Sequence, residues 1–330
     1  QRKTPGFATG ENSRLSHSGY WASLRKKLVN VGGSTYLFLT AYMYVTIMAF
    51  VVFSLRKARQ YARNPLAGRW ELYPVPGESG PRRRYGGSYY EDAGWWAKPR
   101  QVSRVGQYGE MLKEMLFMKN LFLNRGKFWL LSYAMHLGIY LLGLFTLFLI
   151  AGAITEMLGF QLDAGSHLWA AFVYFTTAVM GFTGAFLTAL GSALLLAYRA
   201  TDRVLRKYTT SGEYFNLTFI LAAAASGLAV WGTDLGFNHI RRAVRAMLSL
   251  APIQADGILM VHLLLFGALL MYIPWTKMSH YIGKYFAYHR VLWDNEPNLK
   301  GSALEKIVEK NLADRSSAGW SSPHTKSNKN

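Results

Sequence analysis

An all-α integral membrane protein, built as a bundle of five transmembrane helices with interfacial helices, is the fold class that this sequence predicts. Hydrophobic residues make up 51% of the 330 residues, and charged residues only 17%. The apolar residues are concentrated in five runs that lack Asp, Glu, Lys and Arg. Each run reaches the roughly 20 residues that a membrane-spanning helix needs. The five runs are residues 36–55, 128–155, 168–198, 214–233 and 257–276.

These runs also predict how the chain is organised. We expect an N-terminal arm over residues 1–35, a five-helix membrane domain over residues 36–280 and a C-terminal tail over residues 281–330. A long basic loop, residues 56–127, joins the first two spans and contains the Pro-, Gly- and Arg-rich stretch PVPGESGPRRRYGGSYY.

Three segments outside the spans have the pattern of amphipathic helices. The end of the long loop, VGQYGEMLKEMLFMKNLFLNRGKF, repeats methionine at helical spacing, which is typical of a packing or membrane-contact face. Residues 237–250, FNHIRRAVRAMLSL, set apolar side chains against Arg241, Arg242 and Arg245. This pattern predicts an interfacial helix with the arginines on its polar side. Residues 303–312, ALEKIVEKNL, form a shorter amphipathic piece in the tail.

The positions of Lys and Arg predict the orientation of the chain. Of 37 such residues, 28 fall in residues 56–127, 199–213 and 277–330. Because basic residues are enriched on the cytoplasmic side of a membrane, we expect these three segments in the cytoplasm. The C-terminus is therefore expected there, and an odd number of spans places the N-terminus on the other side.

The composition also excludes several classes of function. Although the net charge is +19, the basic residues flank apolar spans, so we expect anionic lipid headgroups and not nucleic acid as their partners. The chain has no cysteine, which excludes iron–sulfur ligation, covalent c-type haem and disulfides. The first residues show no cleavable signal, so the first span is expected to act as the insertion signal. No P-loop, zinc-protease or nucleophile-elbow motif is present.

Histidines within or beside the apolar runs are the candidate functional residues. His136 lies in the second run, His262 in the fifth and His280 just after it. A spacing of eighteen residues on a continuous helix is five turns, so His262 and His280 would share one face about 27 Å apart. Imidazoles on facing membrane helices are how b-type haem is held by bis-histidine ligation. The pattern therefore predicts a membrane cytochrome b.

The expected orientation places His136 and His280 in the inner leaflet, where they would be the axial ligands of one haem b iron. Gly138, Gly143 and Gly267 are expected to leave room for a flat macrocycle between the helices.

A second haem requires a partner for His262 in the outer leaflet. His167, at the start of the third run, is the preferred candidate, and His239 is the other. Otherwise His262 binds a quinone carbonyl or packs in the protein. At residue 146, ten positions after His136, stands Thr146, which is not a plausible iron ligand.

Three cations are candidate contacts for haem propionates. Pro274 is expected to interrupt the fifth span just before Lys277 and His280. Lys277 precedes His280 by three residues, while Arg199 and Arg203 lie at the inner end of the third span. The alternative for all three is that they extend to lipid headgroups.

Three segments together resemble the nitrate reductase gamma-subunit superfamily of membrane cytochromes b. They are LFLNRGKFWLLSYAMHLGIYLLGL, ALGSALLLAYRATDRVLRKYTTSGEYFNL and HLLLFGALLMYIPWTKMSH. The likeness covers about residues 30–290 and looks strongest to the Dsr, Hme and Tmc membrane cytochromes of heterodisulfide-reductase-like complexes. Its most specific piece is P-x-[ST]-K-x-x-H with a histidine eighteen residues upstream, here Pro274 to His280 with His262.

The resemblance implies two haems b between the second and fifth spans, with His136 and His280 as the inner pair and His262 as an outer ligand. Relatives often place the fourth histidine where this chain has Thr146. The resemblance further implies a bacterial or archaeal cytoplasmic membrane, a menaquinone site, a cytoplasmic iron–sulfur subunit and, in some relatives, a periplasmic multihaem cytochrome c. The 56–127 loop and the tail would form the docking surface.

The expected function is that of an electron-transfer subunit in anaerobic sulfur respiration, which is not catalytic alone. Two other functions are alternatives. An anchor or scaffold subunit that docks redox partners with one haem or none is favoured by Thr146. A transporter is disfavoured because Glu156 and Asp234 lie at the ends of spans and no repeated halves are visible.

Overall fold

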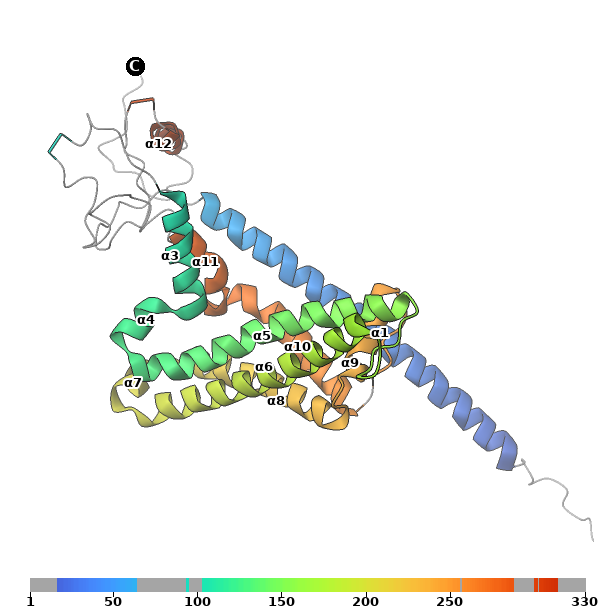
Figure 1. The fold of residues 1–330 in the computed structure, drawn as a ribbon. Coiled ribbons are helices and arrows are strands. Elements are labelled where there is room, and N and C mark those ends of the chain that lie inside the picture. The colour runs from blue at the N-terminus through green and yellow to red at the C-terminus, as the bar shows by residue number, and fades with distance from the viewer. Residues whose placement is uncertain are drawn as a thin grey trace, which may run out of the picture. The chain divides into compact units, whose positions relative to one another are not determined.

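The computed structural model describes residues 17–63, 93–94, 103–255, 257–287, 300–301 and 303–313. All regular elements within these residues are helices, and they contain no β-strand (Figure 1). Five helices are long and apolar enough to cross a membrane. The predicted fold class, an all-α multi-pass membrane protein, is thereby confirmed.

The five candidate spans coincide with the five predicted runs. They are Gly33–Arg63 within α1 (His17–Arg63), α5 (Gly126–Met157), α6 (Leu168–Thr201), α8 (Ser211–Thr233) and Gly257–Trp275. Because α1 begins at His17, the second half of the expected N-terminal arm is helical and continuous with the first span. The last span consists of α10 (Gly257–Tyr272) and a 3-10 turn, η3 (Ile273–Trp275).

Shorter helices account for the three amphipathic segments. The end of the long loop forms α3 (Arg104–Phe117) and α4 (Lys119–Asn124), and the other two segments form α9 (Asn238–Leu248) and α12 (Ala303–Ala313). The remaining elements are α7 (Arg203–Tyr208), η4 (Lys277–Ser279) and α11 (His280–Ala287). The Pro-, Gly- and Arg-rich stretch of the loop lies outside the described residues.

The chain divides into two compact units. Unit 1 comprises residues 1–49 and 131–272, and unit 2 comprises residues 50–130 and 273–330. His136 and His262 therefore belong to unit 1, and His280 belongs to unit 2.

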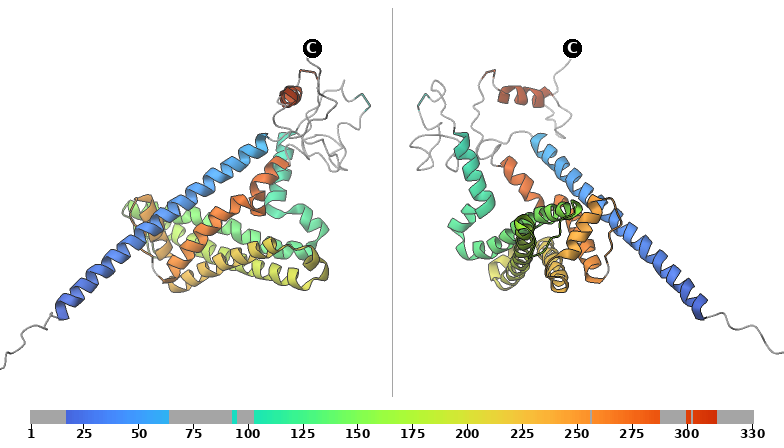
Figure 2. Two further views of the ribbon diagram at one scale, coloured as in Figure 1. Left: turned by 180° about the vertical axis from the view of Figure 1, so that it is seen from behind. Right: turned by 45° about the vertical axis from the view of Figure 1, so that its right-hand side comes forward.

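In unit 1, helices α5, α6 and α8 run side by side (Figures 1 and 2). The contact between α5 and α6 depends on glycine. A Cβ atom added at Gly138 would overlap the backbone nitrogen of Thr188, and one added at Gly191 would overlap the backbone of Met135. Small residues let transmembrane helices approach to backbone contact. On its other side, α8 packs against α10.

The membrane part of α1 is held to the rest of unit 1 by side-chain hydrogen bonds. The Tyr42 hydroxyl donates to the carbonyl of Leu264 over 2.7 Å, and the Tyr44 hydroxyl donates to the carbonyl of Met247 over 2.5 Å. The Thr40 hydroxyl accepts from the backbone N–H of Ile253 at 2.7 Å. The apolar core beside these bonds draws on α1, α5, α8, α9 and α10.

The arginines of α9 do not all lie on its polar side. Arg241 is only 2% exposed, and its Nε donates to Oε1 of Glu156 over 2.7 Å. Its guanidinium also donates to the carbonyl of Gly236 and to the side chain of Asn238. The prediction that Arg241 is on the polar side with Arg242 is therefore wrong. The Glu156 carboxylate, from the end of α5, supplies the partner that a buried cation needs.

In unit 2, the end of α1 packs against the segment that follows α10. The Phe53 and Trp275 rings meet edge to face at 4.6 Å between centroids. At the start of α11, the Tyr281 hydroxyl lies 2.6 Å from Oγ of Ser54. Lys284 lies 3.5 Å from the carboxylate of Glu114, so α11 is tied to α3 as well.

The methionines of the loop end serve packing, as expected. Met111 and Met118 are both 8% exposed. Met118 has a positive φ of 50° and separates α3 from α4 as a sharp elbow. Trp129, at the start of α5, closes this elbow because its Nε1 donates to the carbonyl of Phe117 over 2.8 Å.

Candidate functional site

His136 lies on α5 and is half-buried. Its Nδ1 is 2.7 Å from the carbonyl oxygen of Ser132, one turn earlier on the same helix. Because a carbonyl oxygen only accepts, Nδ1 carries the proton and Nε2 carries the lone pair. A neutral imidazole in this state is a suitable ligand for haem iron through Nε2.

His262 lies on α10 and is oriented by α8. Its Nδ1 is 2.9 Å from Oγ of Ser226, and that hydroxyl donates to the carbonyl of Ala223 over 2.9 Å. Since the hydroxyl hydrogen is used on Ala223, Oγ accepts from Nδ1, so the lone pair of His262 is also on Nε2. Gly227 leaves the space for the ring: a Cβ atom there would lie 3.2 Å from Cε1 of His262.

His280 is the first residue of α11 and is exposed. Its Nδ1 lies 3.1 Å from the carbonyl of Lys277, which gives the same tautomer as in the other two histidines. The contacts of Trp275 and Tyr281 with the end of α1 hold the chain on both sides of this residue.

His262 and His280 are not carried by one continuous α-helix. The helix α10 ends at Tyr272, and the 3-10 turns η3 and η4 follow before His280. The sequence argument that eighteen residues make five turns is therefore wrong for this segment. The interruption expected at Pro274 is confirmed, because proline lacks the N–H that a continuing helix needs. The pairing of His136 with His280 joins residues of two units and stays a prediction.

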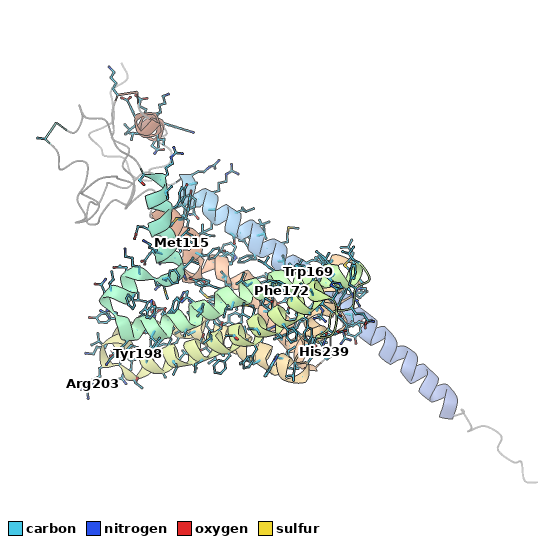
Figure 3. The ribbon with its side chains drawn as sticks, in the orientation of Figure 1. Met115, Trp169, Phe172, Tyr198, Arg203 and His239 are labelled. Carbon is cyan, nitrogen blue, oxygen red and sulfur yellow. The ribbon has the colours of Figure 1, made fainter. Side chains whose placement is uncertain are left out.

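His167 precedes α6 and His239 lies in α9; Figure 3 shows Trp169, near the start of α6, and His239 toward the same end of the bundle. His167 is the N-cap of α6: its Nδ1 accepts from the backbone N–H of Ala170 at 3.4 Å. In the neutral ring this leaves the proton on Nε2, the opposite tautomer to the other three. The backbone N–H of His239 donates to the carboxylate of Asp234 at the start of α9.

The candidate propionate contacts differ in their surroundings. The guanidinium of Arg199 is half-buried and donates to the Thr209 hydroxyl over 3.4 Å. Arg203 on α7 and Lys277 on η4 are both exposed. Figure 3 shows Tyr198 and Arg203 at the opposite end of the bundle from Trp169 and His239.

Two of the three glycines expected to make room for a macrocycle are occupied by protein. Gly138 faces the backbone of α6, and Gly267 faces the ring of Tyr42 on α1. Their role is helix packing, so the expectation is wrong for these two. Gly143 has no atom within 4 Å of an added Cβ.

Sequence reasoning missed three parts of this arrangement. Ser226 and Gly227 lie 36 and 35 residues before His262, and no local pattern links them to it. Ser132 had a visible signal, because a residue four positions before His136 lies on the same helix face. The ion pair between Glu156 and Arg241 joins residues 85 positions apart.

The donor chemistry of the three histidines fits b-type haem. Within the described ranges no group of three or more His, Cys, Asp or Glu residues is gathered to hold a metal ion. Haem needs only axial ligands from the protein, and neutral Nε2 atoms supply them.

The sequence matches no protein-family model, and no curated protein or solved structure is significantly similar to it.

Proposed function

We propose that this multi-pass membrane protein is the haem b subunit of a respiratory redox complex. Its axial ligands would be His136 and His280 for an inner haem, with His262 as a ligand of a second, outer haem. The proposal includes a place in a bacterial or archaeal cytoplasmic membrane, with the C-terminus in the cytoplasm.

The observation that supports this proposal most is the shared state of the three imidazoles. In each ring the protein accepts a hydrogen bond from Nδ1, through Ser132, Ser226 or Lys277. Hydrogen bonds of this kind fix the ring orientation and raise the basicity of the nitrogen that binds the metal. In the neutral ring they leave the lone pair on Nε2, which is the atom that would bind iron.

Haem b, when bound, supplies a one-electron carrier inside the bilayer. The residues of this chain would hold and shield it. The Nε2 atoms of His136 and His280 would bind the iron, and Arg199 and Lys277 would face the propionates. The apolar faces of α5 and α10 would exclude water.

The partners in this proposal are those that the resemblance to the nitrate reductase gamma-subunit superfamily implies. Electrons would pass between menaquinone, or a periplasmic cytochrome c, and a cytoplasmic iron–sulfur subunit. The chain itself has no cysteine, so a cluster on the cytoplasmic side has to come from another subunit. The 56–127 loop and the C-terminal tail would dock that subunit.

One observation favours a scaffold with fewer haems as the second candidate. Thr146 is exposed, and its hydroxyl donates to the carbonyl of Leu142 over 2.9 Å. This residue therefore offers no iron ligand, and the second haem depends on a different partner for His262.

The test is a reduced-minus-oxidised spectrum with haem quantification on the purified full-length chain. We expect a b-type spectrum from the wild-type protein. His136→Ala and His280→Ala should each lose the inner haem completely. His324→Ala, in the C-terminal tail, is the matched control and should keep the wild-type haem content. A wild-type protein that is inserted and folded but carries no haem would rule out the electron carrier.

A further inference from the structure

The connection between the third and fourth spans forms a small surface of its own in unit 1. Helix α6 ends at Thr201, α7 runs from Arg203 to Tyr208, and α8 begins at Ser211. Because α6 and α8 are both candidate spans, α7 lies where two helices leave the membrane. Figure 3 shows Arg203 at this end of the bundle, directed away from it.

The positive charge of α7 forms no ion pair within the part of the chain that the structure describes. Arg203, Arg206 and Lys207 are all exposed, and none of them forms an ion pair with a residue that the structure describes. The neighbouring acid, Asp202, caps α7 instead: its carboxylate accepts from the backbone N–H groups of Val204 and Leu205 at 3.0 and 2.8 Å.

The same short helix exposes two apolar side chains beside these cations. Val204 is 63% exposed and Tyr208 is 79% exposed. They are four residues apart and therefore lie one above the other on one face. Tyrosine is enriched where headgroups meet acyl chains, and a cation beside it is positioned for a headgroup phosphate.

We propose that α7 is a binding site for anionic phospholipid. Arg203, Arg206 and Lys207 would bind the headgroup phosphates, while Val204 and Tyr208 would enter the boundary between headgroups and acyl chains. The occupant is a lipid of the surrounding leaflet because α7 is separated from the two spans by only Asp202 on one side and residues 209–210 on the other. The inference does not depend on haem.

The experiment is native mass spectrometry of the full-length chain in detergent, titrated with phosphatidylglycerol or with phosphatidylcholine. In Arg206→Gln/Lys207→Gln we expect phosphatidylglycerol affinity to fall by about fivefold per charge, so roughly 25-fold in all. Arg206→Lys/Lys207→Arg keeps the charge and should keep the affinity. Lys306→Gln/Lys310→Gln on α12 is the control, since it removes the same charge from a helix that adjoins no candidate span in the sequence.

The expected pattern is a loss of affinity only in the α7 glutamine variant, only for phosphatidylglycerol, and weaker at high salt. Equal losses in the α12 control would mean that net charge alone governs binding and would overturn the site. Unchanged binding in the α7 variant, or equal binding of phosphatidylcholine, would overturn it as well. Size-exclusion chromatography of each variant establishes that the folded protein is being compared.

Discussion

The group that accepts a hydrogen bond from Nδ1 differs from one histidine to the next. At His136 and His280, Nδ1 donates to a backbone carbonyl, whereas at His262 it donates to the hydroxyl of Ser226. A hydroxyl can be removed by substitution and a carbonyl cannot. The hydroxyl beside His262 belongs to a different helix, whereas the Nδ1 contacts of His136 and His280 lie within four residues of each histidine, including the Ser132 hydroxyl 3.5 Å from His136.

Ser226→Ala should release the His262 ring. We expect the Nδ1–H tautomer to lose its dominance, which NMR of protein labelled at the histidine nitrogens would detect without haem. Loss of this one hydrogen bond should cost about 1 kcal/mol of unfolding free energy. Thr146→Ala is the control, because its hydroxyl bonds only to the carbonyl of Leu142. An unchanged His262 tautomer in Ser226→Ala would show that α8 does not orient the ring.

Arg241→Gln should be strongly destabilising, because it leaves the Glu156 carboxylate without its 2.7 Å partner. Breaking a buried pair costs about 3–5 kcal/mol, and we expect the lower end because Arg245 also lies 3.6 Å from Glu156. Arg242→Gln, at an exposed position on the same helix, should leave thermal unfolding unchanged. The double variant Glu156→Leu/Arg241→Met should be more stable than Arg241→Gln, because it leaves no charge of the pair without its partner. A double variant less stable than either single variant would contradict the pairing.

At the scale of elements, the structure relies on a few short-range devices. The elbow between α3 and α4 is fixed by acids: Glu110 bonds Lys113 and Lys119 at 2.8 and 2.7 Å, and Glu114 accepts from the backbone N–H of Asn120. The contact of α5 with α6 relies instead on missing side chains. The elbow should therefore be sensitive to low pH, whereas the α5–α6 contact should be sensitive to larger side chains at its glycines.

The elbow should loosen in acid. Burial raises the pKa of Glu110, but its hydrogen bonds with Lys113 and Lys119 and their charges outweigh burial and hold the pKa below its usual 4.5. A carboxylate whose pKa is lower in the folded state stabilises the fold at pH values above its unfolded-state pKa. This stabilisation is lost as the pH falls through its folded-state pKa. We expect equal hydrogen-exchange protection of residues 104–124 from pH 7 to about 5, and less below about 4.5. The change should stay within about 1 kcal/mol, since the pair is at the surface.

Glu110→Gln should abolish this acid-dependent step, whereas Glu309→Gln on α12 should leave it intact. An acid step of the same size in Glu110→Gln would assign it to a different group.

Gly191→Leu should separate α5 from α6. The new side chain would overlap the backbone of Met135, and overpacking of this kind costs about 1–3 kcal/mol or more. Gly143→Leu on α5 is the matched control, because no atom lies within 4 Å of an added Cβ there. The thermal unfolding temperature should fall only in Gly191→Leu; equal shifts in both would mean that close packing of the two helices is not the cause.

At the scale of the whole molecule, an odd number of spans places the two termini on opposite sides of the membrane. A fluorescent protein fused after Asn330 should fold and fluoresce in the cytoplasm, whereas one fused before Gln1 should not. This outcome follows from the 28 Lys and Arg residues in the segments expected inside. Fluorescence from the N-terminal fusion alone would invert the orientation and exchange the leaflets of His136 and His262.

The crossings could be predicted from the sequence because a charge-free run of about 20 residues has few other uses. The interruption at Pro274 could be predicted too, since its cause is local. The burial of Arg241 could not, because it depends on Glu156, 85 positions away. The contact of the His262 ring with Ser226 and Gly227 of α8 could not be predicted either. In the sequence these two residues look like ordinary small residues of a membrane helix. The prediction that His262 and His280 share one helix face was wrong, because it assumed α-helix geometry through the segment that forms 3-10 turns.

The close contact between Gly227 and the His262 ring limits which substitutions fit at residue 227. Any other amino acid would place a Cβ atom 3.2 Å from Cε1 of the imidazole, so the ring would have to give way by a few tenths of an ångström. A substitution at Gly227 would therefore displace the ring, whereas an exchange of Ser226 for a residue of similar size would change how strongly the ring is polarised.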